Sequence, residues 1–459
     1  MDVLVTTGQL ILSLSILIVL HEMGHFFPAK FFNTKVEKFY LFFDPWFELF
    51  KIQKGETEYG IGWLPLGGYV KIAGMIDESF DTEQMQGEPE PWEFRAKPAW
   101  QRLVIMIGGV TVNFVLGFIL FSMVLFVWGE KYLPTQNAHY GVAVDSLGQE
   151  LGLMSGDKVL AVGDYKMERL NAGVLRTEII INDARKITVE RNGSIQDIQV
   201  PEAVVPALSS YDFKDFRLYN PRVPFVIGGF TKKDSPAKDA GFTEEDQIIA
   251  LNGESTPYFD VFFEKIKKLS KPEMEVAVTA IRTDTVANTV DTLTKSFKTN
   301  VNGFIGASPV NWEYFYEAGR KEYSLGASIP AGIKKGWDFL GNQVKAFGKI
   351  ASGGMKASDS LGSFISIGKM FGTSWDWERF WFMTAMLSLI LAFINLLPIP
   401  ALDGGHVMFL LYEVISGRKP SDKFMEYATM GGFILLLILM VYAIGLDISR
   451  LEFIKNLFN

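Results

Sequence analysis

The stretch LSILIVLHEMGHFF, residues 14–27, places a glutamate and two histidines inside a run that is otherwise apolar enough to enter a bilayer. Continued through Phe31 and Phe32, the run is long enough to cross a membrane as one helix. A charged side chain near mid-membrane costs roughly 3 kcal/mol on insertion scales, and ionisable residues there usually mark a functional site. The stretch therefore predicts a membrane helix that carries chemistry.

His21, Glu22 and His25 form the pattern H-E-x-x-H. Residues i and i+4 share a helix face, so both imidazoles can reach one metal ion while Glu22 takes a proton from bound water. With four histidines and 52 acidic residues among 459, roughly 0.004 such patterns are expected by chance. The alternative is a buried histidine pair bonded to Ser, Thr or Asn of another span, with Glu22 protonated. It explains neither the spacing nor the cost of the charge.

Composition favours membrane segments attached to soluble domains, because 48% of the residues are hydrophobic and the mean hydropathy is +0.17. There is no cysteine, which excludes disulfides, zinc–thiolate sites and cysteine nucleophiles and leaves the redox compartment open. The net charge of −8 argues against nucleic acid as the main partner.

Three further stretches are apolar enough to span a bilayer: Leu103–Trp128, Phe380–Leu397 and Tyr427–Leu446. Lysines and arginines gather between the first two spans and in the short loop between the last two, and such loops face the cytoplasm. Both termini and residues 129–377 are therefore expected on the opposite side of the membrane.

Two stretches between the central spans resemble each other. SLGQELGLMSGDKVLAVGD (146–164) and SPAKDAGFTEEDQIIALNG (235–253) share a small residue, an apolar turn, an acid, a β run and a glycine. Their spacing of about 90 residues predicts a repeated small domain. The pattern is similar to PDZ domains, which bind extended peptide ends by adding a strand, and the first copy is the closer match. Two β-rich domains that only sieve or brace are the alternative.

The stretch AGIKKGWDFLGNQVKAFGKI, residues 331–350, repeats apolar residues every three or four positions with lysines elsewhere around the helix. This spacing predicts an amphipathic helix. Such a helix either lies along the membrane interface or packs against a neighbouring domain.

The end of the third span carries the stretch NLLPIPALDGGH, residues 395–406. Pro398 and Pro400 are expected to end or unwind the helix, and Gly404 and Gly405 to permit a tight turn.

This break offers the ligand that the first span lacks, because a catalytic zinc site needs three protein ligands and an open position. Asp403 is an oxygen ligand on irregular backbone at a membrane edge. His406 is the rival candidate, but Asp403 follows the break more closely and is preferred.

H-E-M-G-H in the first span, N-x-x-P-x-P-x-L-D-G in a late span and paired PDZ-like domains between them resemble the site-2 protease family of intramembrane zinc metalloproteases. The resemblance implies one zinc ion held by His21, His25 and Asp403, with Glu22 as the catalytic acid and base. It also implies that Asn395 helps to hold the substrate backbone.

GIGWLPLGGYVKIAG, residues 60–74, resembles the membrane-associated β-hairpin of this family, which pairs with an unwound substrate segment. The resemblance implies substrate-binding roles for Gly67, Gly68 and Tyr69. Gly and Pro interrupting an aromatic and β-branched run also fit a hairpin on physical grounds, with an ordinary cytoplasmic hairpin as the alternative.

The implied function is hydrolysis of a peptide bond in the transmembrane segment of single-span membrane proteins. Anti-sigma-factor type regulators and signal-peptide remnants are the expected substrates, in regulated intramembrane proteolysis and the envelope stress response. The other expected partner is the bilayer of the bacterial inner membrane, and the PDZ-like domains would bind or sieve substrate ectodomains. A catalytically idle PDZ scaffold and a zinc transporter are the alternatives.

The predicted fold is a polytopic α-helical membrane protein with four transmembrane helices, two extracytoplasmic β-rich PDZ-like domains and a membrane-associated β-hairpin. The predicted segments are a first membrane helix (1–32), a cytoplasmic loop (33–102) with a hairpin at about 57–74, a second helix (103–128), two PDZ-like domains (129–220 and 221–310), an amphipathic helical segment (311–377), a third helix (378–400) and a fourth (427–448).

Overall fold

The chain forms two compact units in its computed structural model. The first comprises residues 1–129, 322–348 and 361–459, and the second comprises 130–321 and 349–360. The structure describes residues 2–65, 67–75, 87–210, 217–269, 271–284, 289–360 and 362–450.

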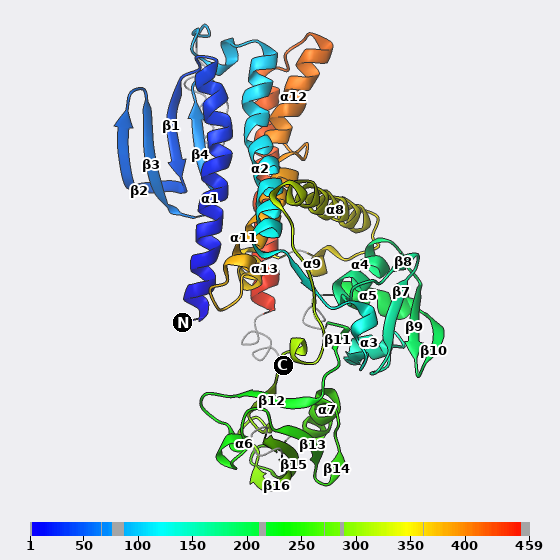
Figure 1. Cartoon of the computed structure of the whole chain (residues 1–459). Helices are drawn as coiled ribbons and strands as arrows, with labels where there is room; N and C mark the ends of the chain where they lie inside the picture. Colours follow the sequence, from blue (N-terminus) through cyan, green and yellow to red (C-terminus); the bar gives the residue numbers. More distant parts are fainter. Residues whose placement is uncertain are drawn as a thin grey trace. The chain divides into compact units, whose positions relative to one another are not determined.

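Long apolar helices build the first unit (Figure 1). Within the described residues, four helices are long and apolar enough to cross a membrane, as predicted: Val3–Phe31, Ala99–Trp128, Trp377–Asn395 and Lys423–Ser449. The helices of this unit are α1 (Asp2–Phe31), α2 (Ala99–Trp128), α8 (Leu325–Ala351, up to residue 348), α10 (Phe364–Met370), α11 (Trp377–Asn395), α12 (Asp403–Ser416) and α13 (Asp422–Ser449).

Helices α1 and α2 cross where both carry glycine. A Cβ on Gly24 would lie 2.5 Å from the carbonyl oxygen of Gly108 and 2.7 Å from Cα of Gly109, and a Cβ on Gly108 would overlap the Gly24 carbonyl. Small residues allow this approach of two helix backbones inside a membrane. Because Gly24 directly precedes His25, the crossing brings the H-E-x-x-H turn of α1 against α2.

Helix α11 joins this pair through buried hydroxyl groups. Ser13 of α1 and Thr384 of α11 share a hydrogen bond of 2.9 Å, and the Ser388 hydroxyl donates to the Asn113 carbonyl of α2 at 2.7 Å. Within an apolar bundle such bonds satisfy polar groups that lipid cannot. The three helices therefore form the frame that positions the H-E-x-x-H turn.

Helix α8 covers the stretch predicted as an amphipathic helix at 331–350. Its buried positions are Ser328, Gly332, Gly336 and Leu340. A Cβ on Gly332 would overlap Ser122 of α2, and one on Gly336 would lie 2.6 Å from the Phe118 ring. The helix therefore packs on α2 through its small residues, and the predicted apolar residues Ile333, Trp337, Val344 and Phe347 remain exposed.

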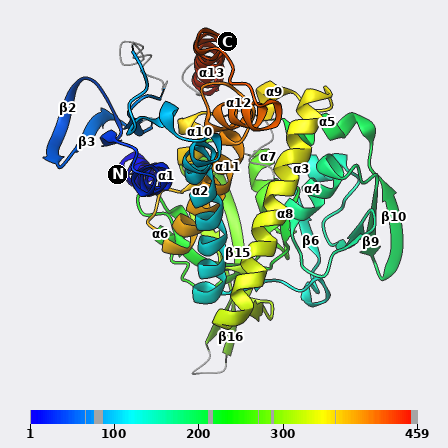
Figure 2. The same cartoon turned by 90° about the horizontal axis from the view of Figure 1, so that it is seen from above.

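A four-stranded sheet lies beside α1 in the order β2-β3-β1-β4, and Figure 2 shows β2 and β3 extending away from the helix. β1 pairs in parallel with β3 and antiparallel with β4. β2 and β3 form an antiparallel hairpin whose turn contains Gly55 at φ 65°. The strands are β1 (Val36–Leu41), β2 (Phe43–Lys54), β3 (Thr57–Leu64) and β4 (Tyr69–Ile72).

The predicted hairpin at 57–74 is wrong in its pairing, because β3 and β4 lie on opposite sides of β1. β3 already has an antiparallel neighbour in β2, to which a two-residue turn joins it. The following chain therefore reaches the other side of β1, where β4 becomes an edge strand. Residues 36–54, which the prediction left out, supply the strands that decide this arrangement.

The described residues of the second unit form two large hydrophobic cores, one drawn from residues 142–219 and one from residues 225–305, and a smaller cluster of Leu133, Ala138, Val223 and Tyr316. The elements of the first part are β5 (Glu130–Tyr132), β6 (Val142–Val144), α3 (Ser146–Glu150), β7 (Lys158–Val162), β8 (Tyr165–Lys166), α4 (Ala172–Ile181), β9 (Lys186–Arg191), β10 (Ser194–Gln199), α5 (Val205–Ser209) and β11 (Tyr219–Pro221). Those of the second part are β12 (Phe225–Phe230), α6 (Pro236–Asp239), β13 (Gln247–Leu251), β14 (Glu254–Ser255), α7 (Phe259–Leu269), β15 (Glu275–Asp284), β16 (Thr289–Lys298), β17 (Ala307–Pro309) and β18 (Gly319–Lys321).

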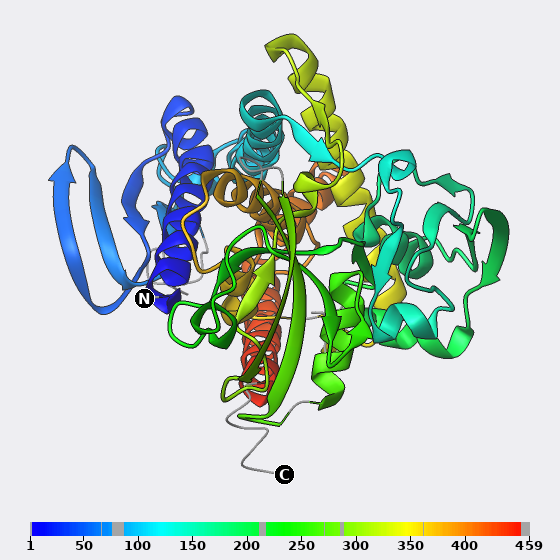
Figure 3. The same ribbon diagram turned by 60° about the horizontal axis from the view of Figure 1, so that its bottom comes forward.

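Each core lies against its own antiparallel sheet. The first sheet has the order β10-β9-β7-β8, and the second the order β16-β15-β13-β12-β17. The long pair β15–β16 is drawn in green in Figure 3. β18 returns to pair with β5, and the short helix α9 (Ala357–Ser360) also belongs to this unit.

Each of the two parts contains a buried aspartate paired with an arginine, and the two pairs stand at matching positions. Asp157 accepts two bonds of 2.8 Å from Arg191, and Asp246 accepts two bonds of 2.7 Å from Arg282. Each arginine also donates to a glycine carbonyl, and each aspartate also accepts a backbone N–H at 2.8 Å. Both aspartate side chains are 1% exposed. The two stretches that resemble each other in sequence therefore adopt the same local arrangement.

Replacing Arg282 tests how much the Asp246–Arg282 ion pair stabilises the second part. Burial acts to raise the pKa of the Asp246 carboxyl, but hydrogen bonds from Arg282 and the Thr243 N–H outweigh it and hold this pKa below its ordinary value. We expect Arg282→Met to destabilise the second part by about 2–3 kcal/mol at pH 7, because it leaves a buried carboxylate without its cation. Hydrogen exchange of β13 and β15 amides in the full chain measures this loss.

The pH dependence of the effect follows from the sign of the shift. Because folding lowers the pKa, the stabilisation is present above the unfolded value of about 4 and is lost as the pH falls through the folded value. The difference in stability between the variant and the wild type should therefore begin to shrink below about pH 4 and disappear only below the folded value. Lys265→Met is the matched control, since its partner Glu254 is largely exposed, and it should change little. Equal losses in the two variants would contradict the prediction.

Candidate metal centre

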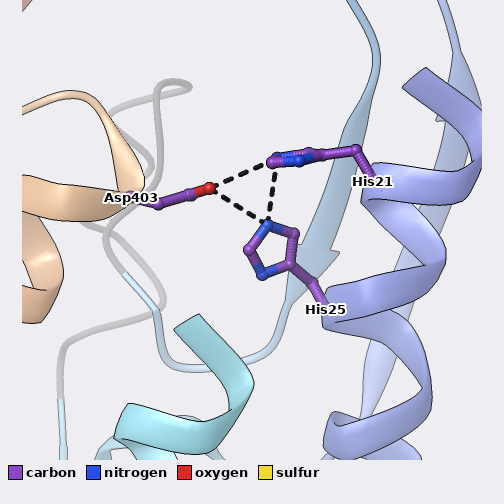
Figure 4. A group of neighbouring side chains, drawn as sticks. All are labelled: His21, His25 and Asp403. Atoms are coloured by element: carbon purple, nitrogen blue, oxygen red, sulfur yellow. Dashed lines mark hydrogen bonds and ion pairs between the residues drawn. The ribbon is translucent and has the colours of Figure 1, made fainter. Parts of the chain in front are cut away.

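Three predicted ligands meet at one point (Figure 4). His21 and His25 project from successive turns of α1, and Asp403 is the first residue of α12. Asp403 Oδ2 lies 3.2 Å from His21 Nε2 and 3.4 Å from His25 Nε2, and the two Nε2 atoms are 3.2 Å apart. Among the described residues, these three form the group of histidine and carboxylate ligands close enough to hold one metal ion.

The spacing of the three atoms fits a zinc ion. Zinc–nitrogen and zinc–oxygen bonds of about 2.1 Å in a tetrahedron set neighbouring ligand atoms about 3.4 Å apart. His25 Nδ1 donates to the Ile105 carbonyl at 2.9 Å, so in the neutral ring Nε2 carries a free lone pair. Asp403 Oδ2 is buried without a hydrogen-bond donor among the described residues. With both Nε2 atoms unprotonated, the three atoms offer converging lone pairs to a cation.

The chain break after α11 delivers Asp403 to this point. α11 ends at Asn395, before the first of the two prolines that are expected to end the helix, so the predicted segment 378–400 extends too far. Ala401 then adopts φ 88°, a left-handed conformation that costs an alanine about 1 kcal/mol or more. α12 begins two residues later with Asp403. This strained turn interrupts the helix so that the first residue of the new helix, Asp403, lies beside the histidines of α1.

The expected tight turn at Gly404 and Gly405 is wrong, because both residues lie inside the first turn of α12. A Cβ on Gly405 would lie 2.5 Å from Cα of Pro400, and one on Gly404 would overlap the Leu397 carbonyl. These glycines are therefore required by close packing of the new helix on the segment before it. The positive φ in the irregular segment between the two helices belongs to Ala401.

All eight predicted site residues line a single cavity of about 810 Å³. Glu22 is buried beside the three ligands, and the Asn395 amide lies 3.5 Å from His21 Nε2. Gly67, Gly68 and Tyr69 border the same cavity from the start of β4. His406 also lines the cavity but lies outside the three-ligand group. The structure therefore groups Asp403, and not its rival, with the histidines.

Two residues of α2 belong to the site and were missed by the sequence analysis. Asn113 is buried and its side-chain amide lies 3.1 Å from Nδ1 of His21. A Cβ on Gly109 would overlap His25 Nε2 and lie 2.7 Å from Cε1 of His21. An asparagine in the uncharged second span was the available signal, because polar residues inside a membrane are costly.

Known proteins are similar to this chain along almost its whole length. The sequence profile of Peptidase family M50 matches residues 9–439. The regulator of sigma-E protease RseP of Escherichia coli (strain K12) is 28% identical over 458 residues, covering 97% of this chain and 98% of that protein. The regulator of sigma E protease of Haemophilus influenzae is 27% identical over 469 residues (98% and 100%). A Vibrio cholerae protein whose name describes a zinc metalloprotease is 25% identical over 468 residues (98% and 100%).

Zinc affinity of two variants separates the rival ligands. Asp403→Ala removes one of three converging atoms, so we expect it to lower zinc affinity about 100-fold or more. His406→Ala should leave the affinity unchanged, because that ring is outside the group. Competition with a chromophoric chelator measures both. A loss confined to the His406 variant would refute the ligand assignment.

Gly109→Ala tests the packing behind the histidines. The new methyl group would occupy the place of the imidazoles, so we expect it to push them aside and lower zinc affinity about tenfold or more. Gly431→Ala is the matched control, because a Cβ at this helical position of α13 meets no atom within 4 Å. Zinc titration of both variants decides, and unchanged affinity in the Gly109 variant would disprove the role of this contact.

Proposed function

Because the chain belongs to Peptidase family M50, the site-2 proteases, we propose that it hydrolyses a peptide bond within the transmembrane segment of single-span membrane proteins. The chain is a zinc metalloprotease of this family. The observation that carries the proposal is the three-ligand group with Glu22 beside it in a cavity formed by membrane-type helices. Anti-sigma-factor type regulators and signal-peptide remnants are the proposed substrates.

His21, His25 and Asp403 hold the zinc ion in this proposal, and Glu22 moves the proton. Bound zinc polarises a carbonyl and makes water more acidic. Glu22 accepts the proton of the attacking water and delivers it to the leaving nitrogen. A carboxylate suits this role here because it shares the cavity with the ligands and lies on the same turn of α1.

The substrate backbone needs new partners, because a transmembrane helix keeps its amides in internal hydrogen bonds until it unwinds. β4 is one of the two edge strands of its sheet, and its first residue Tyr69 borders the cavity. We place an unwound substrate strand along this edge, where main-chain bonds replace those of the helix. The Asn395 amide, close to His21, holds the substrate backbone next to the reacting bond.

The Tyr69 side chain is itself held in place. Its hydroxyl donates to Asp44 at 3.1 Å, and its ring stacks on those of Tyr40 and Phe43. A Cβ on Gly67 would lie 2.7 Å from the Phe43 ring, and one on Gly68 would lie 2.7 Å from the Tyr40 carbonyl. Gly68 therefore lets the chain enter β4 close to β1, and Gly67 leaves room for the Phe43 ring of β2, which supports their proposed place at the substrate edge.

Charge distribution supports the proposed membrane orientation. The loop between α1 and α2 and the segment between α12 and α13 are rich in lysine and arginine and are assigned to the cytoplasm. Both termini and the second unit then lie in the periplasm of a bacterium, with the chain in the inner membrane. The two β-rich parts of the second unit are assigned as PDZ-like domains that bind or sieve substrate ectodomains.

Replacing Glu22 by glutamine tests the proposed function. We expect Glu22→Gln to keep zinc but to lower cleavage by about 10²–10⁴-fold, because the amide cannot shuttle a proton. Cleavage is measured on a panel of single-span membrane proteins mixed with the purified full chain, and a zinc chelator should abolish it.

Glu426→Gln on α13 is the matched control and should cleave like the wild type, since Glu426 does not border the cavity. Full cleavage by the Glu22 variant would refute the mechanism. A wild-type chain that binds zinc without cleaving any member of the panel would favour the scaffold alternative instead.

A further inference from the structure

The Asn113 side chain lies next to the proposed zinc ligand His21, but the proposed reaction gives it no role. It is 1% exposed and lies on α2, opposite the H-E-x-x-H turn. Its Nδ2 atom lies 3.1 Å from His21 Nδ1, while its Oδ1 atom is buried and has no hydrogen-bond partner among the described residues. A buried carbonyl oxygen left without a donor costs about 1–3 kcal/mol.

The protons of His21 conflict with this arrangement. His21 Nε2 faces Asp403 Oδ2 and His25 Nε2, so it must carry no proton if it is to bind the metal. The proton of the neutral ring then sits on Nδ1, where it meets an N–H of Asn113. The His21 Nδ1–H and the Asn113 Nδ2–H then face each other as two donors, while the Asn113 Oδ1 atom accepts no hydrogen bond from the described residues.

A half-turn of the amide removes both faults, because it exchanges Oδ1 and Nδ2 within almost the same volume. We propose that Asn113 is a positioning residue, whose Oδ1 accepts the Nδ1–H of His21 and so fixes the ring with Nε2 toward the metal. The Ile105 carbonyl does the same for His25. α2 then supplies one acceptor to each imidazole, in the way that supporting acceptors orient metal-binding histidines in other sites.

The position of the acceptor is itself fixed. The Ser388 hydroxyl of α11 donates to the Asn113 backbone carbonyl at 2.7 Å, which holds this turn of α2 against α11. Gly109, one turn earlier, leaves the space in which the imidazoles lie. The amide therefore acts on His21 from a backbone that two other helices restrain.

The inference rests on the proposed zinc site, and zinc affinity tests it without any assay of cleavage. Asn113→Leu keeps the shape of the side chain and removes the acceptor, so we expect zinc to bind 10–100-fold more weakly. Asn113→Asp keeps an acceptor and cannot donate, so its affinity should stay within about threefold of the wild type or become tighter. Ser122→Ala, a buried polar position further along α2, is the matched control and should bind like the wild type.

The zinc affinities of the Asn113 variants and of the wild type each support or overturn the inference or the proposed function. Restored binding in the aspartate variant and loss in the leucine variant support the positioning role, because a purely structural asparagine would not be replaced by a buried charge. Wild-type affinity in the leucine variant overturns the inference and leaves the zinc site intact. A loss of tenfold or more in the aspartate variant also overturns it, even if the leucine variant does not fold. A wild-type chain that binds no zinc would refute the proposed function itself.

Discussion

The contact between the backbones of α1 and α2 at Gly24 and Gly108 determines where the histidines of α1 can point. Because the two helices meet without side chains between them, the imidazoles lie directly on α2, and the groups of α2 decide their surroundings. Ile105 offers a carbonyl to His25, and Gly109 leaves room for both rings. A larger residue at the crossing would separate the helices and remove this support, although neither glycine touches a ligand atom of Asp403.

The second requirement is a carboxylate delivered from a distant part of the chain. An aspartate in the middle of an uninterrupted span would be costly, and its direction would be limited by the helix around it. Here one helix ends, Ala401 adopts a left-handed conformation, and a new helix begins with the ligand. The close packing of Gly404 and Gly405 on the preceding segment keeps this interruption compact. The site therefore takes its two histidines from the regular helix α1 and its carboxylate from the start of α12, directly after an irregular turn.

The sequence predicted those features that depend on local spacing or on long apolar runs. The i, i+4 histidines, the four spans and the end of α11 before Pro398 follow from such patterns, and the preference for Asp403 over His406 agrees with the geometry. Features that depend on tertiary contact were missed or wrong. The order of the sheet depends on strands 36–54, the turn at Ala401 has no glycine to announce it, and Asn113 gains its meaning only when α2 meets α1.

The edge position of β4 has a consequence for the choice of substrate under the proposed function. The main-chain bonds of a strand edge can pair with any residue, so these bonds alone do not distinguish one side-chain sequence from another, and side-chain selection would need pockets beside the edge. Discrimination then falls on how readily a helix gives up its own hydrogen bonds inside the membrane. Two segments of equal length and hydrophobicity would differ as substrates if one contained glycine or proline, because these residues weaken a helix. Under the proposed function, helix stability is therefore a property by which this edge can select substrates.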